Sequence, residues 1–377
     1  MERTFFNFDL ALDRTDDGEF VRVTASPADE AVGPFQPPLS QREVTSFHQS
    51  LLTQSDTEPQ QTIRQVGERL YRAIFTGNIR LCWDESLRLA YEQRAHLRLR
   101  LNVQAAPEYA DLPWEYLYDP QRQEFAGLTP HTPLVRHVDL KQPVAPFRVE
   151  PPLRMLVVVA NPGGQPLYDE EDVWLRLVDT LDHLAVERKL VLERLIPATV
   201  HELQRRLRNN QYHILHYIGH GVYDGLAQEH RLLFENEMGR TRPVNSQHLG
   251  ALVHDHFALR LVTLQACPTA QPARQNPFIG VAQQLLRRGL PAAVAIHQPL
   301  PPAVHLPFVD DFYRAVADLT PVDLAMTEAR RLRWITAQDA TWGEAALFLR
   351  TADGGLFVRP PESRPTQRRT FFSWRRP

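Results

Sequence analysis

Two reactive side chains stand at the ends of two apolar runs of this chain. His220 lies between two glycines directly after the run QYHILHYI, Gln211–Ile218. Cys267, one of only two cysteines, follows the run LVTLQA, Leu261–Ala266. A thiol beside an imidazole is a nucleophile beside its base. Neighbouring strands here would predict a cysteine peptidase; otherwise Cys267 is a small core residue and the glycines serve a turn.

The glycine after the histidine has a specific use in this chemistry. Gly221 has no Cβ, so its N–H can approach a substrate carbonyl. Together with the N–H of Cys267 it would form an oxyanion hole, in which each donor contributes roughly 2.7–4 kcal/mol. Asp224, shortly after the histidine, is expected to be a turn residue beside Gly225; the less favoured alternative is the acid of a substrate pocket.

Strands and helices alternate through the second part of the chain. Several of the strands are almost entirely apolar, which indicates burial on both faces. The strands are expected at 155–160, 190–195, 213–218, 259–266, 292–296 and 346–350, and the helices at 170–185, 199–207, 246–253, 278–288, 304–317 and 321–333. This order predicts an α/β fold, a three-layer α/β/α sandwich with a mostly parallel sheet. Both reactive residues then follow carboxyl ends of strands, where such sheets form their sites.

The first part of the chain has a different rhythm. Strands are expected at 4–12, 19–24, 97–103 and 134–138, and helices at 41–53, 61–75 and 85–92. We therefore divide the chain into an α+β N-terminal region (1–145), a proline-rich linker (146–152), the α/β domain (153–358) and a flexible basic tail (359–377). The N-terminal strands would extend or cap the sheet of the α/β domain.

Composition narrows the function classes. The 377 residues carry a net charge of −3, and lysine and arginine are spread along the chain, so no nucleic-acid partner is expected. No apolar run is long enough to span a membrane, and the N-terminus lacks the pattern of a signal peptide. Two cysteines make no disulfide framework, and Cys82 is expected in the core. We expect reduced thiols and a cytoplasmic protein.

These motifs resemble a known family. The segments HYIGHG (His216–Gly221) and LQACPT (Leu264–Thr269) resemble the His-Gly and Ala-Cys motifs of CHAT domains, caspase-like proteins of the clan of separase, gingipains and metacaspases. The segment LPWE (Leu112–Glu115) resembles one upstream of those motifs in many CHAT proteins. Further similarity lies at 134–136, 312–313 and 325–330. The resemblance covers roughly residues 95–350, and the N-terminal region could then be pseudoprotease-like.

The resemblance implies a role for each matching residue. His220 would be the general base, Cys267 the nucleophile, and the N–H groups of Gly221 and Cys267 the oxyanion hole, acting on a protein or peptide through a thioester. No metal or other cofactor is implied. Relatives are commonly gated, so a regulatory protein on another chain is an expected partner. The loops 222–230 and 268–277 are the segments expected to move.

Three features depart from the family pattern. Pro268 follows the nucleophile where an acidic or polar residue is usual, and proline removes an N–H. The stretch Ile296–Pro299 replaces a Leu-Trp-Pro-like one, and no tetratricopeptide repeats are visible. The leading hypothesis is a gated cysteine endopeptidase. The alternative, which Pro268 favours, is a catalytically inactive caspase-like scaffold that binds proteins.

Two other site types are weighed. His213, His216 and His220 could suggest a metal site, but the first points to the opposite face of the strand and no carboxylate is near. The loop Asn161–Gly164 precedes a helix as phosphate loops do, yet lacks their lysine, and the acidic run 169–172 would repel phosphate. Neither site is expected.

Overall fold

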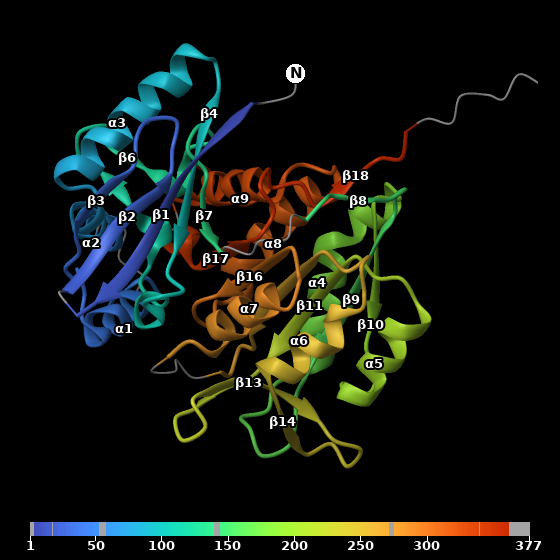
Figure 1. Ribbon diagram of the computed structural model, residues 1–377. Coiled ribbons are helices and arrows are strands. Elements are labelled where there is room, and N and C mark those ends of the chain that lie inside the picture. The colour runs from blue at the N-terminus through green and yellow to red at the C-terminus, as the bar shows by residue number, and fades with distance from the viewer. Residues whose placement is uncertain are drawn as a thin grey trace, which may run out of the picture.

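The computed structural model describes residues 4–16, 18–52, 58–138, 144–270, 275–338 and 340–361. Eleven strands form one sheet in the order β10-β9-β11-β15-β16-β17-β7-β4-β1-β2-β3 (Figure 1). In chain order these strands are β1 (Phe5–Thr15), β2 (Gly18–Ala25), β3 (Ala31–Pro34), β4 (His96–Asn102), β7 (Leu134–His137), β9 (Leu153–Val159), β10 (Leu190–Arg194), β11 (Ile214–Gly219), β15 (Leu261–Ala266), β16 (Ala292–Ile296) and β17 (Ala345–Leu349).

The sheet joins the two parts of the chain without a break. Strands β10, β9, β11, β15 and β16 run parallel, and β17 is antiparallel to β16. Strand β17 then pairs in parallel with β7, which continues through β4 to β1. The N-terminal strands thus lie in the same sheet as the predicted catalytic strands. We call residues 4–138 the N-terminal half and residues 144–361 the C-terminal half.

Helices cover both faces of the sheet, which gives three layers and confirms the predicted fold class. On one face lie α4 (Glu170–Val186), α8 (Pro302–Ala317) and α9 (Val322–Ala337), packed on Met155 and Val157. On the other lie α5 (Val200–Asn209), α6 (Ser246–His254) and α7 (Pro277–Arg287), together with α1 (Gln41–Ser50), α2 (Glu58–Ile74) and α3 (Gly77–Glu92) of the N-terminal half. Leu156 and Val158 face this second layer, so β9 alternates with period two between two cores.

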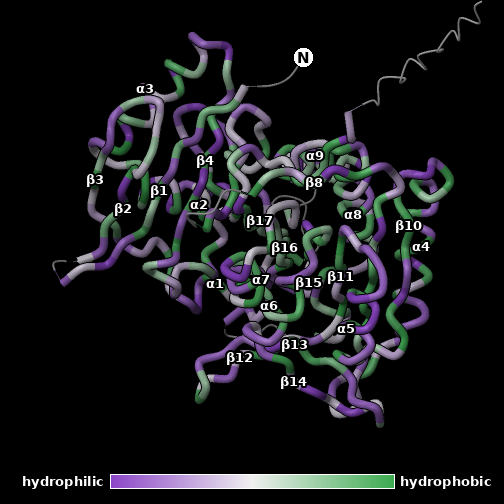
Figure 2. Tube along the Cα trace, turned by 45° about the vertical axis from the view of Figure 1, so that its right-hand side comes forward, coloured by the Kyte–Doolittle hydropathy of each residue, from purple (hydrophilic) through white to green (hydrophobic). Residues whose placement is uncertain are grey.

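Helices α4 and α7 begin at residues whose side chains cap them. Asp169 accepts hydrogen bonds from two backbone N–H groups at 3.0 Å and starts α4. Asn276 does the same for α7, which begins shortly after Cys267. Hydrophobic and hydrophilic residues alternate along the helices (Figure 2). None of the helices in the described ranges is long and apolar enough to cross a membrane.

Several segments differ from the sequence-based prediction or lie outside it. The expected loop 222–230 contains strand β12 (Gly221–Asp224) and the start of β13 (Glu229–Glu235), which pairs with β14 (Thr241–Asn245). The expected linker contains β8 (Phe147–Arg148), which pairs with β18 (Phe357–Val358) because flanking apolar residues pack on the core. The remaining strands of the described ranges form a short hairpin, in which β5 (Tyr118–Asp119) pairs with β6 (Glu124–Phe125). Of the predicted tail, residues 362–377 lie outside the described residues.

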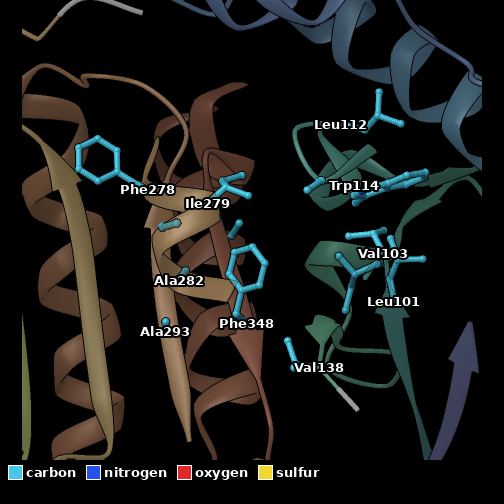
Figure 3. Close-up of a cluster of buried hydrophobic side chains, with 14 of the residues drawn as sticks. Leu101, Val103, Leu112, Trp114, Val138, Phe278, Ile279, Ala282, Ala293 and Phe348 are labelled. Atoms are coloured by element: carbon cyan, nitrogen blue, oxygen red, sulfur yellow. The ribbon is translucent and has the colours of Figure 1, made fainter. Parts of the chain in front are cut away.

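The two halves share one hydrophobic core. Side chains of α7, β16 and β17 face those of β4 and the LPWE segment (Figure 3). Phe278, Ile279 and Phe348 come from one side, and Leu101 and Trp114 from the other, all at most 4 % exposed. Arg98 of β4, also buried, donates to Asp323 of α9 at 2.6 Å. The N-terminal half is therefore part of the structure that supports the predicted site.

Candidate active site

Strand pairing brings the two predicted catalytic residues together. Strands β11 and β15 are parallel neighbours, with Gly219 opposite Ala266. His220 and Cys267, one residue further along each strand, therefore emerge side by side at the carboxyl edge. The Sγ of Cys267 lies 3.3 Å from Nε2 of His220, within hydrogen-bond distance for sulfur. The juxtaposition on which the sequence argument depended is present.

Close packing explains both glycines. A Cβ on Gly219 would lie 2.6 Å from the hydroxyl oxygen of Tyr217, and that hydroxyl contacts the His220 carbonyl at 2.9 Å. A Cβ on Gly221 would lie 2.7 Å from the ring of Pro277, the first residue of α7. The glycines thus let the strand end pass under the helix that follows the nucleophile.

A tight turn holds the nucleophile and gives Pro268 a role. The N–H of Ala270 donates to the carbonyl of Cys267 at 3.1 Å, which closes a β-turn with Pro268 at its second position. Proline is favoured there because its fixed φ matches the turn. The backbone N–H groups of Thr269, Ala270 and Cys267 act to lower the pKa of the thiol, against the larger effect of burial.

Burial keeps both groups neutral at rest. It raises the pKa of the Cys267 thiol above its ordinary value, although the Thr269 hydroxyl and the nearby N–H groups act in the opposite direction. Burial also lowers the pKa of His220, against a smaller effect of the Pro166 carbonyl. Cys267 has no exposed surface, and His220 is 5 % exposed. The resting pair is a thiol beside a neutral imidazole.

A loop covers the pair. We call Asn161–Tyr168 the cover segment; the carbonyl oxygen of its Pro166 lies 3.3 Å from Nε2 of His220 and accepts from the Thr269 hydroxyl at 2.7 Å. Because Nε2 is also the atom nearest the sulfur, it cannot donate to Pro166 and accept the thiol proton at once. The Tyr168 hydroxyl donates to the Ala160 carbonyl at 3.0 Å and fixes the end of the segment. The cover segment thus contacts both His220 and the turn that holds Cys267.

The two predicted oxyanion donors differ in availability. The N–H of Leu233 donates to the carbonyl of His220 at 2.9 Å, so Gly221 opposite Leu232 is a non-hydrogen-bonded pair. The N–H of Gly221 is therefore directed away from β13. The N–H of Cys267 instead donates to the Gly219 carbonyl at 2.9 Å, which extends the strand pairing. In this arrangement the Cys267 N–H is not free to bind an oxyanion.

Asp224 lies apart from the pair, at the tip of the β12–β13 hairpin. Its carboxylate accepts from the N–H groups of Leu226 and Ala227 at 3.0 and 3.1 Å, and it pairs with Arg231 at 3.0 Å. These backbone bonds, chiefly that of Ala227, lower its pKa. The structure therefore places Asp224 as a turn residue with its charge already satisfied, and does not bring it to the cysteine.

The histidines considered as a metal site and the loop considered as a phosphate site make structural contacts. Nδ1 of His213 accepts from the Arg154 N–H at 2.8 Å, and His216 lies 3.0 Å from Gln265 and 3.1 Å from Tyr313. Burial lowers the pKa of both histidines to about 4. In the described ranges, no three His, Cys, Asp or Glu side chains are grouped to hold a metal ion. The loop Asn161–Gly164 uses the N–H of Gly163 to bind the Gly239 carbonyl at 2.8 Å.

A cavity that sequence reasoning missed adjoins the pair. It has a volume of about 60 Å³ and lies between the halves, bounded by α1, the start of α7 and the residues that flank the two reactive ones. The lining residues of its C-terminal side are Gly221, Ala266, Ala270, Asn276, Pro277, Phe278, His297, Gln298 and Pro299. The segment before LPWE contributes Asp111. The only sequence signal was the position of this aspartate beside a recognised motif.

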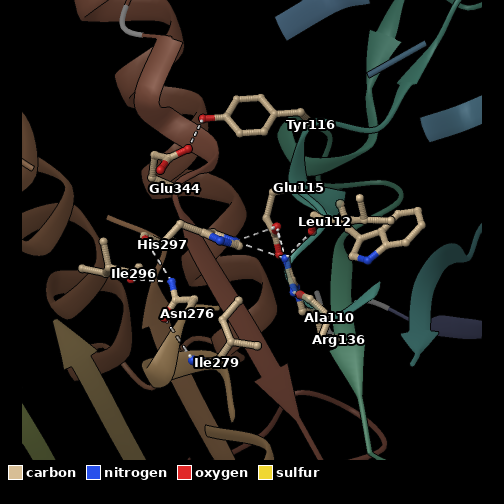
Figure 4. Close-up of polar contacts among 12 residues, drawn as sticks. Ala110, Leu112, Glu115, Tyr116, Arg136, Asn276, Ile279, Ile296, His297 and Glu344 are labelled. Atoms are coloured by element: carbon tan, nitrogen blue, oxygen red, sulfur yellow. Dashed lines mark hydrogen bonds and ion pairs between the residues drawn. The ribbon is translucent and has the colours of Figure 1, made fainter. Parts of the chain in front are cut away.

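A buried polar cluster includes His297, which also lines the cavity (Figure 4). Arg136 donates to both carboxylate oxygens of Glu115 at 2.8 and 2.6 Å, and to the Leu112 carbonyl at 3.0 Å. His297 lies 3.5 Å from the same carboxylate. Burial alone would raise the pKa of Glu115, but Arg136 and His297 outweigh it and hold that pKa well below its ordinary value. The glutamate of LPWE thus fastens the N-terminal half to the loop after β16.

Comparisons with known proteins found one family and several solved structures. The CHAT domain family matches residues 64–374. Among solved structures, the Arg-specific cysteine proteinase gingipain R has 9 % identity and a TM-score of 0.45, with 82 % of this chain and 80 % of that one covered. The Saccharomyces cerevisiae separase–securin complex has 10 % identity and a TM-score of 0.47, with 93 % of this chain covered. This chain spans 30 % of the length of that separase chain. No curated protein matches the sequence.

The family match covers most of the chain. The fold is a mixed α/β sandwich with a large, mostly parallel sheet, and the paired histidine and cysteine stand at its carboxyl edge. This protein belongs to the CHAT domain family, as the motifs of the sequence indicated.

Proposed function

We propose that this protein is a cysteine endopeptidase in which His220 and Cys267 form the catalytic dyad. The observation that carries the proposal is the 3.3 Å separation of Sγ and Nε2 at the ends of two paired strands. The hydrogen-bonding turn around the sulfur adds support, because its N–H groups favour the thiolate. A core cysteine needs neither feature.

The chemistry follows from these atoms. Nε2 of His220 takes the thiol proton while Sγ attacks the substrate carbonyl carbon. The C–N bond then breaks, and the imidazolium gives its proton to the departing amine. His220 next takes a proton from water, which attacks the thioester. The C–S bond breaks, and the sulfur recovers a proton as the acid product leaves. The Gly221 N–H would hold the oxyanion in both halves of the reaction.

The same geometry supports control by opening. The cover segment occupies Nε2 of His220 through Pro166, and the Cys267 N–H is bonded to Gly219. We propose that a regulatory protein, or the substrate itself, shifts the cover and frees this N–H as the second oxyanion donor. We further propose a reducing compartment, the cytoplasm, because the mechanism requires a free thiol.

A second function remains open. A catalytically inactive scaffold that binds proteins is favoured by the occupied Cys267 N–H and by burial, which raises the thiol pKa. Pro268 no longer argues for it, since the proline fits the turn. The two functions differ in whether Cys267 reacts with peptide-directed electrophiles faster than with a simple alkylating agent.

The test is covalent labelling. The labelling rates of peptidyl acyloxymethyl ketones with Arg, Leu or Asp next to the reactive ketone are compared with the labelling rate of iodoacetamide. The modified residue is identified by mass spectrometry. We expect a peptidyl probe to label Cys267 at least about 100-fold faster than iodoacetamide does. His220→Ala should lose this advantage, since general-base assistance contributes about 10²–10⁴-fold.

Cys82→Ser is the matched control. Cys82 is the other cysteine, buried in the N-terminal half, where its thiol donates to the Asp29 carbonyl at 2.9 Å. A serine can make the same bond, so this variant should be labelled like the wild type. Peptidyl labelling that persists in Cys267→Ala would refute the dyad. Equal, His220-independent rates for all reagents would favour the scaffold.

A further inference from the structure

The Pro166 carbonyl and the Cys267 sulfur lie beside the same two side chains. The carbonyl oxygen lies 3.3 Å from Nε2 of His220 and accepts a hydrogen bond from the Thr269 hydroxyl at 2.7 Å. The Sγ of Cys267 lies 3.3 Å from the same Nε2 and 3.5 Å from the same hydroxyl oxygen. The cover segment and the reactive sulfur therefore compete for one imidazole and one hydroxyl.

The Thr269 hydroxyl can donate to only one of the two at a time. A hydroxyl carries a single hydrogen, which turns about the C–O bond without movement of the heavier atoms. In the resting structure this hydrogen is directed to Pro166, whose carbonyl oxygen can only accept. The neutral thiol has no need of it, because a thiol has a hydrogen of its own to share with His220. A thiolate can only accept, so it would gain this donor once the carbonyl has moved away.

The backbone near the sulfur lacks this freedom. The N–H groups of Thr269, Ala270 and Cys267 lower the pKa of the thiol, but burial raises it more. Two of the three already donate elsewhere: the Cys267 N–H to the Gly219 carbonyl at 2.9 Å, and the Ala270 N–H to the Cys267 carbonyl at 3.1 Å. A peptide N–H is fixed in the plane of its peptide bond and cannot turn toward the sulfur as a hydroxyl can.

The titratable side chains near the sulfur are neutral in the resting structure. His220 is in contact with the sulfur, and burial lowers the pKa of its imidazole. Tyr168 and Tyr217 lie close enough for the charge of a Cys267 thiolate to act on them, and burial raises the pKa of both. Their hydroxyls donate to backbone carbonyls, at 3.0 Å for Tyr168 and 2.9 Å for Tyr217. A thiolate that forms here therefore depends on neutral hydrogen-bond donors.

We infer that Thr269 is a third catalytic residue, whose hydroxyl donates a hydrogen bond to the Cys267 thiolate once the Pro166 carbonyl has withdrawn. The inference rests on the proposed function, in which the cover segment opens and the thiol proton passes to His220. Thr269 transfers no proton; its hydrogen turns from the carbonyl oxygen to the sulfur. Withdrawal of one carbonyl would thus free the base and supply the donor in a single event.

A purely structural role of Thr269 predicts a different result. If its hydroxyl only ties down the cover segment, its loss makes Cys267 more accessible at every pH. If the hydroxyl stabilises the thiolate, its loss raises the pKa of the thiol and moves the reaction to higher pH. The rate of iodoacetamide labelling distinguishes the two roles, because its level at high pH reports access and the midpoint of its pH profile reports thiolate formation.

The test is this pH profile, measured in Cys82→Ser up to the pH at which the rate levels off. We expect Thr269→Val, which keeps the branched shape of the side chain, to shift the midpoint upward by at least about one pH unit, as loss of a hydrogen bond to a charged group requires. Thr269→Ser keeps a hydroxyl and should restore the wild-type midpoint. An unshifted midpoint in Thr269→Val, or an equal shift in Thr269→Ser, would overturn the inference.

Thr241→Val is the matched control. The Thr241 hydroxyl donates to the Gly163 carbonyl at 2.8 Å, so it ties another residue of the cover segment to β14. Its loss should raise the labelling rate about fivefold at every pH and leave the midpoint unchanged. A midpoint shift as large as that of Thr269→Val would mean that loosening of the cover causes the shift, and would refute a donor role for Thr269.

Peptidyl ketones separate this inference from the proposed function. Iodoacetamide requires no bound peptide, so the midpoint shift can be seen whether or not the protein cleaves peptides. A shift in Thr269→Val without faster labelling by any peptidyl ketone would support the Thr269 donor and refute the peptidase. Fast peptidyl labelling that depends on His220, together with an unshifted midpoint in Thr269→Val, would support the peptidase and refute the third residue.

Discussion

Two buried sets of polar residues differ in how many partners their charges and polar atoms have. The cluster of Glu115, Arg136 and His297 holds full charges, and each charge has several partners. The pair of His220 and Cys267 is as deeply buried, but both members are neutral and share one contact at 3.3 Å.

The difference distinguishes residues that stabilise the fold from residues that could change their protonation state. In the cluster, low dielectric strengthens charges that are already matched, so a change of protonation is unfavourable. In the pair, burial opposes charge on both members, so a charged state forms only when substrate, a moving loop or higher pH helps. Three predictions test this comparison.

The largest effect is expected in the cluster. Glu115→Gln leaves the guanidinium of Arg136 buried without its carboxylate, which should lower the free energy of unfolding by about 3–5 kcal/mol. Urea unfolding followed by circular dichroism measures this. Glu68→Gln, which breaks an exposed pair with Arg72, should cost less than about 1 kcal/mol. Equal costs for the two variants would show that the cluster is not a special support.

The second prediction concerns the pH dependence of the pair. Below its raised pKa, the Cys267 thiolate fraction grows about tenfold for each pH unit. The lowered pKa of His220 leaves little imidazolium near neutral pH to hold a thiolate. The rate of iodoacetamide labelling, measured in Cys82→Ser, should therefore keep rising from pH 7 to 8.5. A rate that is already constant between pH 6 and 8 would mean a preformed thiolate–imidazolium pair.

The smallest effect is expected at the cover segment. Tyr168→Phe removes the hydroxyl that donates to the Ala160 carbonyl, a bond worth about 1 kcal/mol. Opening should become about fivefold more frequent, and labelling of Cys267 at fixed pH about fivefold faster. Tyr223→Phe removes a comparable hydroxyl contact to Gln228 on the exposed hairpin and should change nothing. Unchanged labelling in Tyr168→Phe would mean that the segment does not limit access.

The strands beside the site could be predicted closely. The expected strand 292–296 coincides with β16, and 213–218 is shifted from β11 by one residue. Strands buried on both faces are apolar throughout, so their limits stand out in the sequence. His220 and Cys267 each follow a predicted strand directly. Because the carboxyl ends of parallel strands share one edge of the sheet, this position also predicted the edge at which the two residues meet.

Contacts between distant segments could not be predicted. Strand β12 and the start of β13 have mixed polar residues and lie in a segment that was expected as loop, since pairing rather than burial defines them. The Pro166 carbonyl reaches His220 from 54 residues away, and backbone atoms leave no mark in the residue types. Asp111 was not singled out from the sequence, because its cavity exists only once the two halves are packed.

The late position of β17 in the sequence has a consequence for folding. His137, the last residue of β7, contacts the carbonyl of Leu349 at 3.1 Å, across 212 residues of sequence. Strand β17 fills the place between β16 and β7, so the sheet can be completed only when one of the last strands arrives. Contacts of such long range close slowly. On the ribosome, β16 would have an unpaired edge until β17 has been made, which delays completion of the sheet that carries His220 and Cys267.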